Sequence, residues 1–269
     1  MKVVLLCGGQ GMRIRDPEND RPKPLAIIGN RPILWHLMKY YAYFGHTDFI
    51  LCLGYKAELI KEYFVEYREW ESNDFSLRGD DLRLHGADIA DWTITFVDTG
   101  ELATTSERLA AVEPHVGGDE LFLANYADGL TDQWLPDHVA MVRASEVAAS
   151  FMVVPTPSSF HVARVGDDDR CTAIEPLSES DVWINAGFFV LRPEVFRYLR
   201  PGEELTDSFA GLIEERRLMA YRYRGFWRAM DTFKDQQWFE QSLRAGKAPW
   251  QLWERQPGPD RPIVRAAER

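Results

Sequence analysis

The start of the chain constrains the fold more than any other segment. Residues 3–7 are a short aliphatic and β-branched run that stops abruptly at Gly8 and Gly9. A run of this kind is typical of a strand buried on both faces, as in a parallel sheet. A glycine loop directly after such a strand lets backbone N–H groups approach phosphate oxygens. We therefore expect an α/β protein with a candidate phosphate-binding loop at its first strand.

Strand-like and helical segments alternate after this start. Residues 33–44 and 57–67 carry the apolar spacing of helices, with a buried strand at residues 48–53 between them. This alternation of strands and helices predicts a Rossmann-like, mostly parallel sheet with helices on both faces. Ligands bind such sheets at the carboxyl ends of strands, which directs attention to the loops after Cys7, Val97 and Ala124. Further strands are expected at residues 92–97, 121–124, 149–154, 161–165 and 186–191.

The length of the chain fits one main domain. We assign residues 1–253 to it and residues 254–269, which are polar and contain three prolines, to a small C-terminal extension. Residues 71–91 are polar and interrupted by Gly79 and Gly86, so they are expected to leave the sheet.

Charge and cysteine content exclude several protein classes. The net charge of -11 disfavours a nucleic-acid binder, which needs a basic surface, so an anionic ligand requires a local cationic pocket. The three cysteines lie far apart and suggest neither a disulfide framework nor a zinc cluster. No apolar window is long enough to span a membrane. A cytoplasmic protein without a nucleic-acid or membrane partner is expected.

The first group of candidate functional residues is the glycine loop GGQGMR, residues 8–13, with Lys23 held between Pro22 and Pro24. Fixed Arg and Lys charges can stabilise the negative charge that develops as pyrophosphate leaves. The loop matches neither the Walker pattern nor the full dinucleotide fingerprint. Taken alone, the residues also fit a tight turn followed by a solvated basic loop.

Two aspartates form the second group. Asp128 directly follows a buried strand, and Asp231 lies far downstream. If folding brings them together, two carboxylates can hold a Mg²⁺ that bridges phosphate oxygens. Each could instead be a turn or helix-capping residue, and composition alone does not pair them.

Together, the glycine loop, Arg13, Lys23, Asp128 and Asp231 resemble the sugar-phosphate nucleotidyltransferase family. Other stretches point to its glucose-1-phosphate cytidylyltransferase branch, and the resemblance extends to about residue 253. These stretches are PILWH at 32–36, GYK at 54–56, IKEYF at 60–64, VDTG at 97–100, WIN at 183–185, GFW at 225–227 and KAPW at 247–250.

The resemblance implies a nucleotide-diphospho-sugar transferase fold and a magnesium-dependent enzyme, commonly a homo-oligomer. It implies transfer of CMP from CTP to a sugar 1-phosphate, by default glucose 1-phosphate, with in-line attack and release of pyrophosphate. The catalytic residues that it implies are Arg13, Lys23 and Asp128, and the implied metal ligands are Asp128 and Asp231. The implied nucleotide site consists of Gly8, Gly9, Gly11, Met12, Arg13, Lys23 and Arg108. The implied acceptor site consists of Tyr126, His161, Glu175, Trp183 and Asn185.

Several departures from the family fall on the acceptor side. Residues 175–177 are Glu-Pro-Leu where the family has Glu-Lys-Pro, so the lysine expected to hold the sugar phosphate is absent. The neutral, rigid Pro176 cannot replace it. His161 stands where a family glycine leaves space beside the sugar, and Met12 replaces the usual loop threonine. The departures predict a remodelled acceptor site.

Three other interpretations remain open at this point. The same chemistry could act on a different phosphorylated or phosphonate acceptor. The chain could be a non-catalytic regulatory relative that binds a nucleotide without releasing pyrophosphate. A dinucleotide-dependent oxidoreductase is disfavoured by the glycine spacing and by the lack of a clearly placed acidic ribose residue after the second strand.

Overall fold

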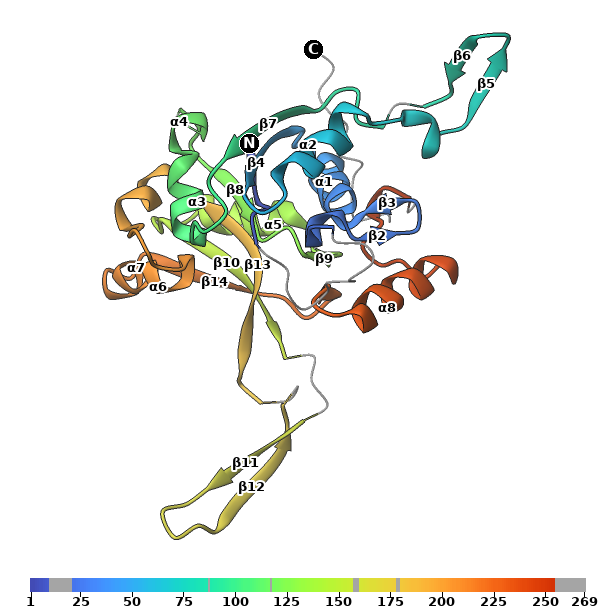
Figure 1. Cartoon of the computed structure of the whole chain (residues 1–269). Helices are drawn as coiled ribbons and strands as arrows, with labels where there is room; N and C mark the ends of the chain where they lie inside the picture. The colour runs from blue at the N-terminus through green and yellow to red at the C-terminus, as the bar shows by residue number, and fades with distance from the viewer. Residues whose placement is uncertain (10–20, 87, 117, 157–159, 178–179, 255–269) are drawn as a thin grey trace.

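A seven-stranded sheet forms the centre of the protein (Figure 1). The computed structural model describes residues 1–9, 21–86, 88–116, 118–156, 160–177 and 180–254. Neighbouring strands in the sheet are parallel except where β13 pairs antiparallel with β10 and β8, which confirms the mostly parallel sheet. The sheet order is β14 (Leu218–Arg222), β10 (Ala149–Pro155), β13 (Trp183–Leu191), β8 (Phe122–Asn125), β1 (Val3–Leu6), β4 (Asp48–Leu53) and β7 (Thr93–Asp98).

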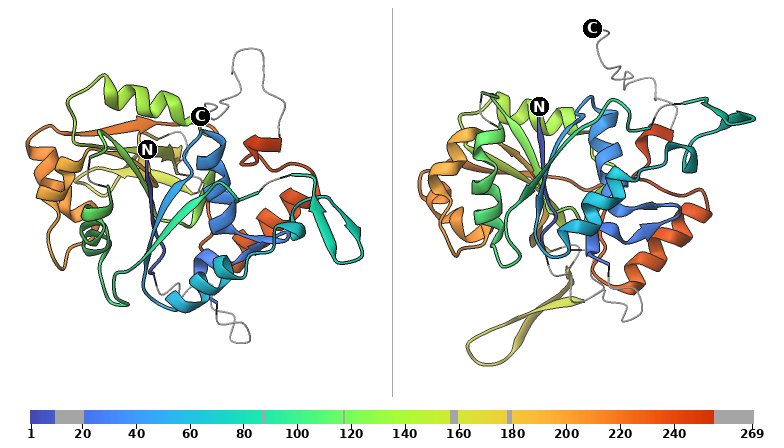
Figure 2. Two further views of the ribbon diagram at one scale, coloured as in Figure 1. Left: turned by 90° about the horizontal axis from the view of Figure 1, so that it is seen from above. Right: turned by 45° about the horizontal axis from the view of Figure 1, so that its top comes forward.

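Helices cover both faces of this sheet (Figure 2). Val3 and Leu5 of β1 pack in one core cluster with α1 (Ile33–Tyr43) and α5 (Leu135–Arg143). Val4 and Leu6 point the other way, into a second cluster. Alternate residues of a strand face opposite sides of a sheet, so a run of aliphatic residues in β1 indicates burial on both sides. The second cluster packs α3 (Thr105–Ala111), α4 (Glu113–Val116), α6 (Leu205–Ser208) and α7 (Ala210–Glu214) against the sheet.

Several further described elements are short or peripheral. They are α2 (Ala57–Val65), α8 (Phe233–Arg244), the 3-10 turns η1 (Lys23–Leu25), η2 (Glu69–Glu71), η4 (Pro193–Tyr198) and η5 (Leu252–Glu254), and the paired strands β2 (Ile27–Ile28) with β3 (Arg31–Pro32) and β9 (Gly129–Thr131) with β15 (Trp227–Ala229). No helix among the described residues is long and apolar enough to cross a membrane.

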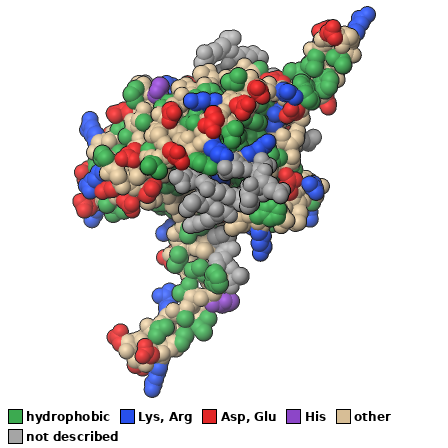
Figure 3. Space-filling view, viewed as in Figure 1, with side chains coloured by type: hydrophobic (Ala, Val, Ile, Leu, Met, Phe, Trp, Pro, Cys, Tyr) green, Lys and Arg blue, Asp and Glu red, His purple; other side chains and the backbone are tan. Residues whose placement is uncertain are grey.

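Two antiparallel hairpins project from the body of the protein (Figures 1 and 3). One pairs β5 (Phe75–Arg78) with β6 (Asp81–Leu84), which confirms that residues 71–91 leave the sheet. The other pairs β11 (His161–Val165) with β12 (Cys171–Pro176). Residues 161–165 therefore form the expected strand, but in a hairpin of their own rather than in the central sheet.

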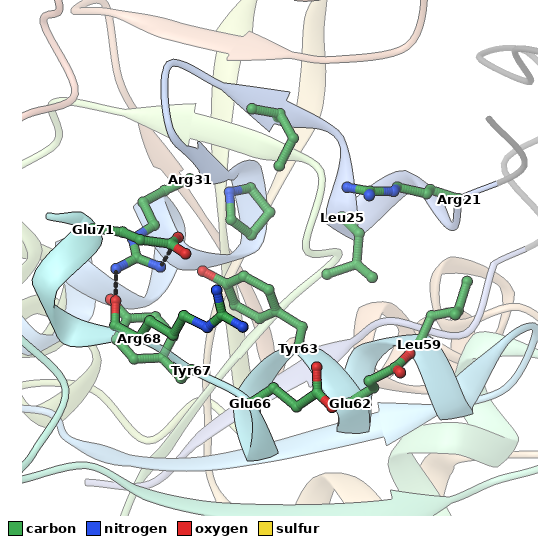
Figure 4. Close-up of a pocket in the computed structure, with 12 residues that line it drawn as sticks. Arg21, Leu25, Arg31, Leu59, Glu62, Tyr63, Glu66, Tyr67, Arg68 and Glu71 are labelled. Atoms are coloured by element: carbon green, nitrogen blue, oxygen red, sulfur yellow. Dashed lines mark hydrogen bonds and ion pairs between the residues drawn. The ribbon is translucent and has the colours of Figure 1, made fainter.

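Arg31 is a buried cation that joins β3 to the segment around η2. Its side chain is 2% exposed; Nε donates to Ser72 Oγ at 2.9 Å, and Nη2 donates to the Arg68 carbonyl at 2.8 Å. Ion pairs reach Glu71 at 3.4 Å and Asp88 at 3.9 Å. This network forms one side of a cavity of about 270 Å³ between η1, β3 and α2 (Figure 4).

Replacing Arg31 with Met should destabilise the fold, because it leaves the buried Asp88 carboxylate without one of its cations. We expect Arg31→Met to lower the free energy of unfolding by about 3–5 kcal/mol, as for other broken buried ion pairs. Urea denaturation measures this. Arg83→Met, at an exposed position on β6, is the matched control and should change stability little. A loss below about 1 kcal/mol for Arg31→Met would contradict the role given to this network.

Candidate active site

Lys23, Asp128 and Asp231 meet at one point although they are far apart in sequence. The Lys23 Nζ lies 2.7 Å from Asp128 Oδ2 and 2.6 Å from Asp231 Oδ1. Lys23 opens η1, Asp128 follows β8, and Asp231 follows β15. The pairing of the two aspartates, which the sequence left open, is therefore present in the structure.

The short pair β9–β15 brings the two aspartates together. Ala229 lies opposite Gly129, and the Met230 N–H donates to the Asp128 carbonyl at 2.8 Å. Asp128 and Asp231 are thus held at adjacent ends of two hydrogen-bonded strands. Because β8 is parallel to β1, the Asp128 loop lies at the same edge of the sheet as the glycine loop.

The charges in this cluster do not balance. Burial lowers the pKa of Lys23, but the charges and hydrogen bonds of Asp128 and Asp231 outweigh burial, so the pKa is raised and the amine stays protonated. Burial raises the pKa of the Asp128 carboxyl and the Asp231 charge adds to this, whereas Lys23 opposes it. Two carboxylates beside one ammonium group carry a net negative charge, which a further cation can neutralise.

The backbone before Asp128 adopts an uncommon conformation. Ala127 has a φ of 62°, in the left-handed region that non-glycine residues seldom adopt. Its N–H donates to the side-chain oxygen of Asn125 at 2.9 Å, and Ala127 itself is fully buried. Strain of this kind concentrates at functional sites, where the surrounding structure holds it in place. Here it directs the chain from β8 toward Asp128.

A cavity of about 420 Å³ lies at the carboxyl ends of β1 and β8. This volume is within the range of small-molecule sites. Five residues predicted from the sequence line it: Gly8, Gly9, Arg108, Tyr126 and Asp128. Its other lining residues are Leu6, Glu101, Leu102, Ala103, Thr105 and Glu204.

Arg108 has a structural role that the sequence did not indicate. It is only 3% exposed, and the guanidinium donates hydrogen bonds that join the loops after β1, β4 and β7. A Cβ at Gly8 would lie 2.0 Å from its Nη1, and a Cβ at Gly54 would lie 2.6 Å from it. The acceptors are the carbonyls of Gly8 (3.0 Å), Leu53 (3.2 Å), Gly100 (2.8 Å) and Glu101 (3.1 Å) and Thr99 Oγ1 (2.7 Å).

Of the predicted residues Tyr126, Asn185 and Trp183, Tyr126 lines this cavity, Asn185 contacts Tyr126, and Trp183 begins the same strand as Asn185. The Asn185 side-chain amide donates to the Tyr126 hydroxyl at 3.4 Å, and its side-chain oxygen accepts from the Gly187 N–H at 2.8 Å. Gly187 has a φ of 77°, and a Cβ there would lie 2.7 Å from the Tyr126 ring. The glycine two residues after Asn185 is therefore required by both backbone conformation and contact with Tyr126.

His161 and Glu175 are not brought to the cavity. Both lie on the projecting β11–β12 hairpin, where His161 is exposed and paired with Pro176. The Glu175 carboxylate accepts from Arg164 Nη2 at 3.0 Å, within the same hairpin. His161 is therefore not among the residues that line the cavity, because its strand pairs with β12 outside the central sheet.

Comparisons with known proteins agree with this geometry. The nucleotidyl transferase family model matches residues 2–235. The chain belongs to the nucleotidyl transferase family. This nucleotidyltransferase is 40% identical over 258 residues to a probable glucose-1-phosphate cytidylyltransferase of Bacillus subtilis, covering 94% of this chain and 100% of that protein. It is 35% identical over 257 residues to the glucose-1-phosphate cytidylyltransferase of Salmonella typhimurium, again covering 94% and 100%.

Solved structures agree on the fold. A UDP-glucose pyrophosphorylase complexed with UDP-glucose superposes on this nucleotidyltransferase with a TM-score of 0.66 and 14% identity, covering 91% of this chain and 98% of that one. The UTP-bound UGPase from Acinetobacter baumannii gives a TM-score of 0.63 and 17% identity, covering 90% and 92%. At these identities the likeness supports the nucleotide-diphospho-sugar transferase type of fold.

The described part of this nucleotidyltransferase offers two carboxylates, and no larger cluster, for a metal. Within it, no group of three or more His, Cys, Asp or Glu side chains is placed to hold an ion. Mg²⁺ is commonly bound by one or two carboxylates together with substrate phosphates and water. Asp128 and Asp231 therefore form a donor set of the right kind and number for Mg²⁺ on a bound nucleotide.

Part of the predicted nucleotide site lies outside the described residues. Gly11, Met12 and Arg13 belong to the segment 10–20, which is not among the described residues. Their assigned roles stay predictions.

Proposed function

We propose that this nucleotidyltransferase transfers CMP from CTP to a sugar 1-phosphate, by default glucose 1-phosphate, and releases pyrophosphate. The observation that carries the proposal is the meeting of Lys23 with Asp128 and Asp231 beside the glycine-loop cavity. The relatives named as glucose-1-phosphate cytidylyltransferases support the choice of donor and acceptor.

The reaction balances without a covalent intermediate. A phosphate oxygen of the acceptor attacks the α-phosphorus of CTP, and the bond from that phosphorus to the oxygen bridging it to the β-phosphate breaks on the opposite side. The products are a CDP-sugar and pyrophosphate. Little covalent chemistry falls to the protein in such a transfer, so positioning and electrostatic stabilisation are its main contributions.

Different residues of the site would contribute to positioning and to electrostatic stabilisation. Lys23 supplies a fixed positive charge for phosphate oxygens, and the backbone N–H groups of Gly8 and Gly9 are available at the end of β1. Arg108 keeps the loops around the cavity in place through its carbonyl contacts. Asp128 and Asp231 would hold Mg²⁺, which when bound neutralises charge on the phosphates.

A non-catalytic relative is the second candidate, because Pro176 stands where the family has its acceptor lysine. The close approach of Lys23 to both carboxylates favours catalysis, since a nucleotide-binding regulator has no need for this costly cluster of charges. A different phosphorylated or phosphonate acceptor would also explain Pro176.

The proposal is tested by measuring pyrophosphate release with Mg²⁺ and CTP, UTP, dTTP or ATP, each with a panel of sugar 1-phosphates and phosphonates. We expect release with CTP and with at least one sugar 1-phosphate. Measurable CTP binding without release for any acceptor would instead indicate the regulatory relative.

A further inference from the structure

Two arginines lie against one tryptophan at the active-site edge of the sheet. The Cζ of Arg224 lies 4.7 Å, and that of Arg222 5.4 Å, from the centre of the Trp183 ring. Both arginines are exposed, and among the described residues no carboxylate is paired with either guanidinium. The Asp181 carboxylate accepts from the Trp183 indole N–H at 3.1 Å, but no ion pair among the described residues joins it to either arginine. In a chain with a net charge of -11, two adjacent cations outside any ion pair are unusual.

The strand register places these side chains on the same face as Asn185. Val153 of β10 lies opposite Asn185 of β13 and opposite Arg222 of β14. Residues directly opposite in adjacent strands point to the same face, and so do residues two apart along one strand. Arg222, Asn185 and Trp183 therefore share one face at the edge where β10 and β14 end.

This face continues to the reacting centre. Asn185 contacts the Tyr126 hydroxyl, and Tyr126 lines the cavity together with Asp128. Trp183 lies two strand residues beyond Asn185, which is roughly 7 Å. The contacts from Asp128 through Tyr126 and Asn185 therefore lead from the reacting centre toward Trp183. An acceptor whose phosphate lies at Lys23 and Asp128 and that extends along these contacts would present its far end to Trp183.

Arginine is suited to bind an anion at this place. Its planar guanidinium matches carboxylate and phosphate groups with paired hydrogen bonds, and stacking on an aromatic ring fixes its orientation in advance. Arg222 and Arg224 are oriented in this way by Trp183. The acceptor lysine of the family is meanwhile absent, because position 176 is proline.

We propose that Trp183, Arg222 and Arg224 form an anion clamp for a second negative group on the acceptor, at the end remote from the reacting phosphate. The inference rests on the proposed function and narrows its substrate class to sugar 1-phosphates that carry an additional carboxylate or phosphate.

The test compares three acceptors with CTP and Mg²⁺: glucose 1-phosphate, glucuronic acid 1-phosphate and glucose 1,6-bisphosphate. The wild-type enzyme should have a kcat/KM about 10- to 100-fold higher for a doubly charged acceptor than for glucose 1-phosphate. The R222A/R224A variant should lose this preference while keeping its KM for CTP. Arg197→Ala, at an exposed arginine on η4, is the matched control and should keep the preference.

Two outcomes would overturn the clamp while the proposed function stands. One is equal kcat/KM for all three acceptors in the wild-type enzyme. The other is a uniform fall for all three in R222A/R224A, which would place the arginines on the reacting phosphate.

If no acceptor is turned over, the proposed function fails, and binding of the same acceptors is measured by calorimetry. Tighter binding of a doubly charged acceptor that is lost in R222A/R224A would still support the clamp. Equal binding by both proteins would overturn it.

Discussion

Asp128→Asn should lower kcat/KM by about 1000-fold or more, the scale seen when a group that stabilises transition-state charge is removed. An amide has the shape of the carboxylate but lacks the charge that would hold Mg²⁺ beside Asp231. It also removes one of the two anions that fix Lys23, whose Nζ lies 2.7 Å from Asp128. Initial rates at saturating Mg²⁺ measure the effect.

The stability of this variant separates chemistry from folding. The Asp128 side chain is 31% exposed and the substitution is nearly isosteric, so the free energy of unfolding should change by no more than about 1 kcal/mol. Asp137→Asn, at an exposed position in the first turn of α5, is the matched control and should retain full activity. Retention of more than about a tenth of the activity by Asp128→Asn would refute the metal assignment.

Lys23→Met should reduce kcat/KM by about 1000-fold, because it removes the fixed positive charge at the phosphates. It should also lower stability at neutral pH by about 1–2 kcal/mol, since two carboxylates then face each other without the ammonium group. Without Lys23, burial and the Asp231 charge raise the pKa of the Asp128 carboxyl further, and only a backbone hydrogen bond still opposes them.

This raised pKa of the Asp128 carboxyl determines how the stability of Lys23→Met changes with pH. A carboxyl whose pKa in the folded state exceeds its ordinary value of 3.8 favours the fold when protonated. That contribution is lost as the pH rises through the folded-state value. The stability difference between Lys23→Met and the wild-type protein should therefore narrow from pH 8 to pH 5.

Urea denaturation at the two pH values measures the difference. Lys234→Met, at an exposed position on α8, serves as control and should show no such trend. A stability gap of equal size at both pH values would contradict the charge balance described for Lys23, Asp128 and Asp231.

Local patterns were sufficient to predict much of the fold. The buried run at residues 3–7 and the alternation after it gave the parallel sheet, because burial on both faces leaves an uninterrupted apolar signal. The helix expected at residues 57–67 ends at Val65, a difference of the size usual at helix ends. Residues 254–269 were expected to form a polar extension, which lies almost wholly outside the described residues.

Contacts between distant residues could not be derived from residue types alone. Asp128 and Asp231 meet through β9 and β15, strands of three residues each that carry no clear local signal. Arg108 was predicted to contact the nucleotide, whereas its described hydrogen bonds go to backbone carbonyls and one threonine hydroxyl. The available signal was the glycine at position 54, which leaves space for the guanidinium.

The acceptor side shows the same limit. His161 and Glu175 were assigned by resemblance, but they lie on a hairpin whose pairing is independent of the central sheet. Arg222 and Arg224 were not singled out, although two arginines directly before the GFW stretch were a visible charge signal. The cytoplasmic location and the homo-oligomeric state stay predictions.

The most direct test of the central claim follows the atoms of the acceptor phosphate. Glucose 1-phosphate, or the preferred acceptor, is labelled with ¹⁸O in its phosphate oxygens and incubated with CTP and Mg²⁺, and the products are analysed by mass spectrometry and ³¹P NMR. Attack by the acceptor phosphate on the α-phosphorus predicts a CDP-sugar that retains all the label, unlabelled pyrophosphate, and no product when EDTA removes the metal. Formation of CMP without a CDP-sugar, or label in the pyrophosphate, would contradict the account.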